Sequence, residues 1–389
     1  MTSIALALLT FILPTTPSPI PAPPNQPSLC DCYTISGPDP GHFTHYGFWD
    51  FRNIPLPTTN PPTILTNTTP FSQTPLAADW LPQTWDRAST KLGPIPISNV
   101  ASNVFIAPNP DPERPALNPT YLLLRTTRQP THASTAEVEF QRRNILHCSL
   151  RVKLRIMSEE IALAAPSSSY KSPDSERTRS RDKGMTPARR KPNINHVPKG
   201  ACVGLFTYHS KTCESDIEIL TSDPPHAVHY ANQPDYDPVT DTSIPGSSMM
   251  VNLPEPWTSW TTHRLDWLQG TSNWYADGGL QAVKSYGVPD QPSMVVLNLW
   301  SDGGLWSGDL EVGQSVYLGV EWIEMAFNVS SAVEDPVNAL TRTRHRPPTV
   351  DAMDSLGPLG RNLSTPITST PNSPAKASCQ RACYLNDFH

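Results

Sequence analysis

The chain has 389 residues, a formal net charge of −6 and an isoelectric point near 6.0, so it lacks the basic excess that marks nucleic-acid-binding proteins. The length suits one β-sandwich of roughly 220 residues with tails. Its 45 prolines are far above average usage and predict extended linkers and loops in the regions where they gather, 14–27, 55–75, 108–119 and 336–374.

The first twelve residues are mostly apolar and lead into a proline-rich stretch. This pattern is typical of a short signal-peptide core, and the apolar run is too short to span a membrane. We therefore expect residues 1–27 to be a signal peptide and leader, no membrane span, and a secreted protein. Three Asn-x-Ser/Thr triplets agree with a secreted glycoprotein: Asn67, Asn328 and Asn362.

Four of the seven cysteines lie near the two ends of the chain, at Cys30, Cys32, Cys379 and Cys383. In a secreted protein they predict disulfides, which either tie the two termini together or form local bridges. A zinc site built from Cys30 and Cys32 is the less favoured alternative, because the spacing matches no common zinc pattern. Three further cysteines fall inside the predicted sandwich: Cys148, Cys202 and Cys213.

Short segments with strand-like patterns begin after the leader, and they are 46–52, 104–106, 121–125, 136–140 and 149–156. The last two alternate with period two, as half-buried strands do. In the segment 136–140, Glu137 and Glu139 face either the substrate or the solvent, and the pattern does not decide between these two orientations.

Residues 157–198 break this pattern with a Ser/Arg/Lys-rich run of low hydrophobicity. Such composition predicts disorder, and a structureless insert of about 40 residues is uncommon within a compact domain. We interpret the segment as a disordered insert or as an artefact of the gene model.

Three acidic residues, Glu214, Asp216 and Glu218, alternate along the next strand-like segment. Residues two apart in a strand point to the same face, so the three carboxyls should share one surface and raise one another's pKa values. At about 3.3 Å per residue the two glutamates can bring their carboxyls within roughly 5–6 Å, which suits a retaining glycosidase better than an inverting one. The alternative is a solvent-facing strand with exposed charges.

Three more segments follow in order, with Asp-Gly and Gly-Gly turns between them: 260–267, 273–279 and 294–306. Together with Glu-x-Asp-x-Glu, the His-Arg-Leu-Asp-Trp, Trp-Tyr-x-Asp-Gly and Asn-Leu-Trp-Ser motifs make the chain resemble glycoside hydrolase family 16, which includes lichenases and laminarinases. The resemblance runs from about residue 103 to 328. It implies an all-β, concanavalin A-like jelly-roll β-sandwich over residues 28–330 of a fungal-type secreted member, followed by a Pro/Ser/Thr-rich tail at 331–389.

The resemblance implies that Glu214 is the nucleophile, Glu218 the general acid/base and Asp216 an assisting carboxylate. It also implies substrate contacts at Tyr230, Asn232, Trp300 and Trp306. The chemistry agrees, because apolar sugar faces stack on aromatic rings while amides and hydroxyls orient them. Two other tryptophans, Trp267 and Trp274, lie within strand-like runs and are expected in the core.

The chain departs from the family at Thr212-Cys213, where lichenases usually carry a Trp before the first catalytic Glu. We predict a secreted, monomeric retaining endo-glycosidase that hydrolyses β-1,3 and/or β-1,3-1,4 glucans, with a polysaccharide as its partner. The alternatives are a cell-wall transglycosylase on the same scaffold and a non-catalytic lectin. No cofactor is predicted; a structural calcium ion would fit the family, but no compact Asp-rich loop identifies a site.

Overall fold

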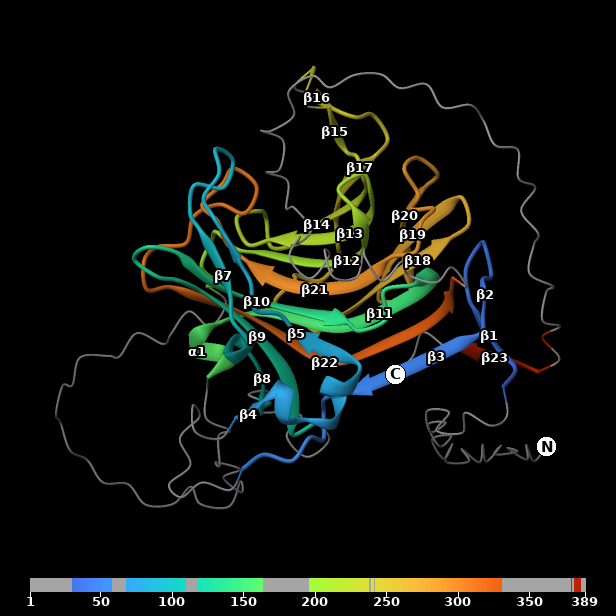
Figure 1. Ribbon diagram of the computed structural model, residues 1–389, viewed down its shortest axis with the longest axis horizontal. Coiled ribbons are helices and arrows are strands. Elements are labelled where there is room, and N and C mark those ends of the chain that lie inside the picture. Colours follow the sequence, from blue (N-terminus) through green and yellow to red (C-terminus); the bar gives the residue numbers. More distant parts are fainter. Residues whose placement is uncertain are drawn as a thin grey trace, which may run out of the picture.

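The computed structural model describes residues 30–57, 68–109, 118–163, 196–237, 239–240, 242–330, 379 and 381–385 (Figure 1). The predicted all-β jelly-roll sandwich is confirmed. The predicted leader and most of the predicted tail lie outside the described residues, as do the triplets at Asn67 and Asn362.

The strands are β1 (Cys32–Ile35), β2 (His42–Phe43), β3 (His45–Asp50), β4 (Thr69–Pro70), β5 (Trp80–Pro82), β6 (Asp86–Arg87), β7 (Ile97–Asn99), β8 (Val104–Pro108), β9 (Thr120–Arg128), β10 (Ala133–Phe140), β11 (Ile145–Ser158), β12 (Cys202–Ser210), β13 (Cys213–Leu220), β14 (Ala227–Asn232), β15 (Tyr236–Asp237), β16 (Thr242–Ser243), β17 (Ser248–Asn252), β18 (Thr261–Leu268), β19 (Thr271–Ala276), β20 (Gly279–Lys284), β21 (Met294–Trp300), β22 (Ser315–Val329) and β23 (Ala382–Leu385). The short helices are η1 (Phe71–Gln73), η2 (Pro75–Ala78), η3 (Ala101–Asn103) and α1 (Glu159–Ala162).

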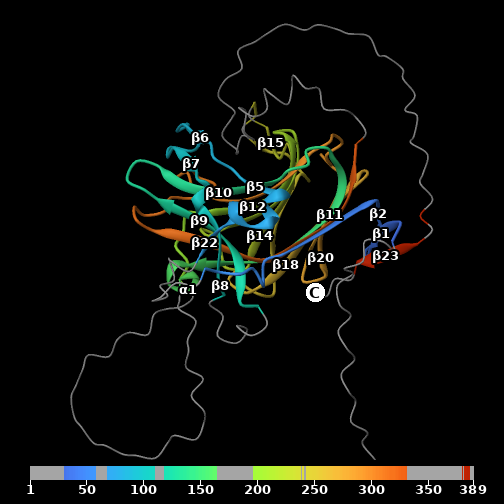
Figure 2. The ribbon, with the colours of Figure 1, turned by 60° about the horizontal axis from the view of Figure 1, so that its bottom comes forward.

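One sheet, here called the carboxylate sheet, has the order β5-β10-β21-β12-β13-β14-β17, with every neighbouring pair antiparallel. The second sheet, the back sheet, runs β20-β19-β18-β11-β22. The far edge of β22 then pairs with β9 along one half and with β3 along the other. Figures 1 and 2 show the two sheets as layers.

Strand β10 joins the two sheets, because its first residues pair with β7 and β9 and its later residues with β5 and β21. Between the sheets lies one large apolar core, to which the alternate residues of each strand contribute. The two tryptophans expected in the core, Trp267 and Trp274, are fully buried there, as predicted.

The predicted Asp-Gly hairpin is confirmed between β19 and β20. Asp277 and Gly278 have φ values of 45° and 77°, the left-handed conformation that a two-residue hairpin turn of this type requires at both positions. The turn fixes the pairing of β19 with β20 at one edge of the back sheet.

A small sheet of order β2-β1-β23 closes the chain against the back sheet, and we call it the clasp. Its strands β1 and β23 run parallel and are cross-linked by two disulfides, Cys30–Cys383 and Cys32–Cys379. Of the two disulfide alternatives, the one that ties the termini together is therefore confirmed, and these cysteines hold no zinc. The three inner cysteines are free and buried.

The structure shortens the predicted insert. Strand β11 continues through Ser158 into α1, and Met157 and Ala162 are buried in a small cluster with Tyr121 and Tyr317. Residues 196–198 are also described, so the described structure extends into both ends of the interval 157–198. The reason is that the apolar residues of 156–163 pack on β9 and β22, which period-two reasoning does not detect. Residues 164–195 lie outside the described part of the chain.

Candidate active site

The strand β13 lies in the middle of the carboxylate sheet, between β12 and β14. Its residues Ile217 and Ile219 enter the core between the sheets. The alternate residues Glu214, Asp216 and Glu218 therefore share the opposite face, which we call the carboxylate face. The two glutamates are partly exposed, whereas Asp216 is buried.

The register of the sheet extends this face sideways into rows. Glu218 lies opposite Gly204 of β12, which in turn pairs with Asn298 of β21, and Asn298 pairs with Glu137 of β10. One row along, Asp216 pairs with Phe206, and that row ends at Glu139. The position that the sequence left open for Glu137 and Glu139 is thus settled by register, since both fall in rows of the carboxylate face.

The absence of a side chain at Gly204 leaves room beside Glu218. A Cβ atom at this position would lie 2.7 Å from Asn298 Oδ1, so Asn298 occupies the space above the glycine. Asn298 Nδ2 donates to Glu137 Oε2 at 3.3 Å, and Trp85 Nε1 donates to Glu137 Oε1 at 2.8 Å. Glu137 thus holds Asn298 and Trp85 next to the row that carries Glu218.

Burial raises the pKa of all three carboxyls on β13. The pKa of Glu218 rises to about 8, with the charge of Asp216 adding to burial and the Trp306 indole and Cys202 thiol opposing it. Burial raises the pKa of Asp216 to about 7, and it raises the pKa of Glu214 well above its usual range with help from the Asp216 charge. The trio therefore retains protons near neutral pH.

The middle carboxyl links the other two. Hydrogen bonding with Asp216 contributes to the raised pKa of Glu214, and Asp216 Oδ2 accepts a hydrogen bond from Gln233 Nε2 at 3.1 Å. A proton held between Glu214 and Asp216 can move to Asp216 when Glu214 ionises. This arrangement lets one glutamate become a carboxylate nucleophile while the other, Glu218, stays a protonated acid, which is the division of roles that double displacement requires.

These raised pKa values predict a pH dependence of stability. The folded protein holds protons that the unfolded chain releases above about pH 4, so the trio's contribution to the free energy of unfolding should fall from pH 5 to pH 8. Glu218→Gln removes one of these carboxyls, so the free energy of unfolding of this variant should fall less between pH 5 and pH 8. We therefore expect the thermal midpoint of Glu218→Gln minus that of the parent to increase between pH 5 and pH 8. A difference that stays constant or decreases would contradict the raised pKa of Glu218.

Glu218 also has neighbours that its own strand does not supply. The Cys202 thiol donates to Glu218 Oε1 at 3.4 Å, and His229 of β14 lies directly opposite Glu218 in the register. His229 Nε2 lies 2.6 Å from Asp223 Oδ2, and its ring packs edge-on against Trp306 at 5.0 Å between ring centres. The acid/base candidate thus sits among a thiol, an imidazole and an indole.

The predicted tryptophans gather at this end of the face. Trp300 is opposite Cys202 in the register and packs with it, with Trp85 and Trp306 against the same cluster. Trp300 is only 4% exposed, whereas Trp306 is partly exposed. Trp306 is therefore the better placed of the two to present a ring face to a sugar.

The loop that carries Trp306 is held by Asp302. Asp302 Oδ1 accepts from Gly304 N and from Ser307 Oγ, each at 2.9 Å, and its Oδ2 pairs with Arg87 Nη2 at 2.6 Å. Because this loop is tied at both sides of Trp306, the indole has a fixed position next to His229 and Glu218.

The predictions that Tyr230 and Asn232 contact the substrate are not supported by their placement. Both residues are fully buried, and the register sets them opposite Ile217 and Ser215, on the core side of the sheet. Tyr230 stacks on Trp274 of the back sheet, and Asn232 Oδ1 accepts a hydrogen bond from Ser215 Oγ. Successive residues of β14 face opposite sides of the sheet. The residue on the carboxylate face is therefore Ala231, which lies between them and opposite Asp216.

This placement gives a matched pair of variants. Trp306→Ala removes a ring from the carboxylate face, and we expect kcat/KM on a soluble glucan to fall about tenfold or more, the usual effect of losing an aromatic anchor. Tyr230→Phe removes a buried hydroxyl that has no hydrogen-bond partner among the described residues, so kinetics should stay at the parent level. Equal losses in the two variants would place Tyr230, too, on the carboxylate face.

Four residues of the face were not identified from the sequence: Trp85, Cys202, His229 and Gln233; the side faced by Glu137 was left open. All of these except His229 lie on strands or loops whose register with β13 is set only by tertiary pairing. The one available signal was the alternation along β14, because a strand antiparallel to β13 must place either His229 or Tyr230 on the carboxylate face. Among the described residues, no cluster of three or more His, Cys, Asp or Glu side chains could hold a metal ion.

No family model matches the chain. Among curated proteins, it is similar to beta-glucanases of Paenibacillus polymyxa, with 27% identity over 139 residues, and of Bacillus subtilis, with 25% identity over 195 residues. These alignments cover 33% and 46% of this chain, and 54% and 75% of the respective relatives. A third, from Paenibacillus macerans, is 29% identical over 69 residues, which are 17% of this chain and 29% of that relative. The chain therefore spans less than two thirds of the length of two of these three relatives.

Among solved structures, the Bacillus licheniformis beta-glucanase aligns with a TM-score of 0.43 at 17% identity, covering 67% of this chain and 96% of that one. The laminarinase catalytic domain of Thermotoga maritima aligns with a TM-score of 0.44 at 14% identity, covering 68% and 97%. The chain is thus similar to beta-glucanases over about a third to a half of its length, which agrees with the resemblance of its four ordered motifs to glycoside hydrolase family 16.

Proposed function

We propose that the protein is a secreted retaining endo-glycosidase that hydrolyses internal β-1,3 and/or β-1,3-1,4 bonds of cell-wall glucans. The observation that carries this proposal is the row of three buried or partly buried carboxyls on one face of β13, whose pKa values are all raised. The beta-glucanase names of the curated relatives support the choice of a glucan.

In the first step, Glu214 ionises as its proton passes toward Asp216, and its carboxylate attacks the anomeric carbon. Glu218 donates its proton to the glycosidic oxygen, the bond from the anomeric carbon to that oxygen breaks, and a glycosyl ester forms on Glu214. In the second step, Glu218 takes a proton from water, the water oxygen bonds to the anomeric carbon, and the ester bond to Glu214 breaks.

The raised pKa of Glu218, about 8, keeps this carboxyl protonated at neutral pH, as an acid in the first step requires. A lectin has no need of three neighbouring carboxyls with raised pKa values, because holding them together costs stability without contributing to sugar binding. The structure therefore favours the hydrolase over the lectin. The transglycosylase differs only in the acceptor, and no contact of the described residues favours it.

Secretion is part of the proposal and is supported by the two disulfides of the clasp, which persist in oxidising compartments. Across the described residues, no helix combines the length and the apolar character needed to cross a bilayer.

The proposal is tested by incubating the purified protein with barley mixed-linkage glucan and with laminarin, and by measuring reducing ends and product sizes. We expect one or both glucans to give short oligosaccharides from the earliest times, as internal cleavage does. Products that are larger than the starting chains would favour the transglycosylase, and an absence of cleavage on both would contradict the hydrolase.

A further inference from the structure

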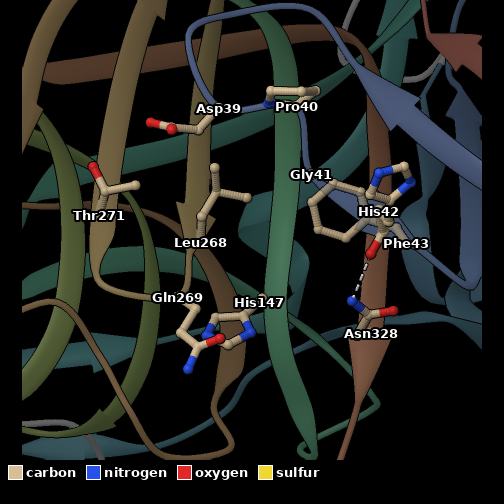
Figure 3. A pocket seen from close by; sticks show the side chains of 10 residues that line it. All are labelled: Asp39, Pro40, Gly41, His42, Phe43, His147, Leu268, Gln269, Thr271 and Asn328. Carbon is tan, nitrogen blue, oxygen red and sulfur yellow. Dashed lines mark hydrogen bonds between the residues drawn. The ribbon is translucent and has the colours of Figure 1, made fainter. Parts of the chain in front are cut away.

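A cavity of about 340 Å³ lies next to the clasp, and none of the residues that line it belongs to the carboxylate face (Figure 3). One wall of the cavity is the loop at Asp39–Gly41, which connects β1 to β2. Another wall is the turn between β18 and β19, with Gln269 and Thr271. Phe43 and Leu268 line it as well; they belong to the apolar cluster beneath the clasp, which is separate from the main core.

The cavity wall is fixed in place by the chain's own hydrogen bonds. Asn328 Nδ2 donates to the carbonyl oxygen of His42 at 2.9 Å (Figure 3). Its Oδ1 accepts from Thr44 N at 3.0 Å. The disulfides of the clasp hold the strand that leads into this loop. These bonds also engage the amide nitrogen of one predicted glycosylation triplet, the one at Asn328.

His147 lines the cavity from an irregular part of the backbone. The pairing of β11 with β22 is interrupted between Ile145 and Cys148, and within this bulge His147 has a φ of 71°. A bulge re-aims a side chain, and a non-glycine residue in the left-handed region is strained unless the surroundings maintain it. Here the His147 ring packs edge-on against Trp267 at 5.4 Å and lines the cavity.

The lining determines which kind of ligand fits. It contains one carboxylate (Asp39), two imidazoles (His42 and His147), the Gln269 amide and the Thr271 hydroxyl, beside the Asn328 amide that already bonds within the wall, but no Lys or Arg. Burial lowers the pKa of His147, so this ring is neutral at neutral pH and can both donate and accept hydrogen bonds. Without a cation there is little to bind an anion, and no metal-ligand cluster occurs among the described residues. The mixture of donors and acceptors over an apolar floor suits a neutral, hydroxyl-rich molecule.

We propose that this cavity is a second saccharide-binding site, which holds one or two sugar rings of a neutral polysaccharide while the carboxylate face acts on another part of it. The identity of the sugar rests on the proposed function, whereas the site itself rests on the cavity lining. Holding a polymer at two places raises its effective concentration at the carboxylate face, so the site would serve long chains and not short ones.

The experiment uses affinity electrophoresis in gels that contain barley mixed-linkage glucan or laminarin. The background variant is Glu214→Gln with Trp306→Ala, which prevents cleavage and weakens binding at the carboxylate face. Adding Asp39→Ala and Gln269→Ala changes two exposed side chains of the cavity, so folding should be unaffected. We expect the background variant to be retarded by glucan, and the added pair to raise its dissociation constant about tenfold.

Two further measurements separate this inference from the proposed function. In the protein with intact Glu214 and Trp306, Asp39→Ala with Gln269→Ala should slow hydrolysis of the polymer but leave kcat on a short soluble oligosaccharide unchanged. His147→Asn, which tolerates the left-handed backbone, should weaken retardation without lowering the thermal midpoint. Retardation that is the same with and without the cavity substitutions would overturn the second site, whatever the parent's activity. If the parent cleaves neither glucan but the cavity variants lose retardation, the second site stands and the proposed hydrolase fails.

Discussion

Glu214→Gln and Glu218→Gln should each reduce glucan hydrolysis by about 10² to 10⁴-fold or more, the range for loss of a positioned acid/base or nucleophile. The reason differs between them. Glutamine at 214 cannot form the glycosyl ester, whereas glutamine at 218 cannot protonate the leaving oxygen. Reducing-end release at saturating glucan, measured beside the parent, gives the loss directly.

The matched control is Glu255→Gln, which changes an exposed glutamate outside the carboxylate face in the same chemical way. We expect it to retain parental activity. A second readout distinguishes the two catalytic variants: an activated aryl glycoside needs little acid assistance, so Glu218→Gln should still release the aryl group from it, and Glu214→Gln should not. Parental activity in either variant on natural glucan would show that β13 does not carry the chemistry.

Removing the clasp disulfides should have the largest effect on stability. Each bond joins positions more than 340 residues apart, and loss of a native disulfide typically costs about 2–5 kcal/mol. We expect Cys30→Ser with Cys383→Ser to lower the thermal midpoint clearly, and removal of both bonds to lower it further.

The clasp contributes to stability because it covers an apolar cluster on the back sheet. Tyr33, Ile35 and Phe43 of the clasp pack on Leu268 and on Ala326 of the back sheet. Nearby, Arg264 pairs with Asp266 at 2.6 Å and also donates to Ser36 beside β1, so opening the clasp would expose a buried ion pair to solvent. The control is the parent in reducing buffer, which should match the variant that lacks both bonds. A midpoint that stays at the parental value when both bonds are removed would show that the two disulfides contribute nothing to stability.

The sequence predicted β13 well because its signal is local. Alternation of acidic and apolar residues determines a shared face without any knowledge of neighbouring strands, and the four ordered motifs located the strands on either side. The Asp277-Gly278 hairpin was equally local, since its two positions require left-handed backbone that few residue types adopt easily.

Residues whose position depends on pairing between distant segments were harder to predict. Tyr230 and Asn232 carry side-chain types that suit sugar binding, but the pairing of β14 with β13 turns both into the core. Glu137 and Cys202 join the carboxylate face only because β10, β21 and β12 assemble beside β13. Side-chain chemistry alone does not determine which face of a strand is buried.

The most direct test of the central claim is the anomeric form of the first product. Hydrolysis of a mixed-linkage glucan oligosaccharide, followed by proton NMR from the first minutes, shows the newly formed reducing end before it mutarotates. Double displacement through Glu214 and Glu218 predicts that the β-anomer appears first. An initial α-anomer would contradict the account, because it would mean that water attacks the sugar directly and that no glycosyl ester forms on Glu214.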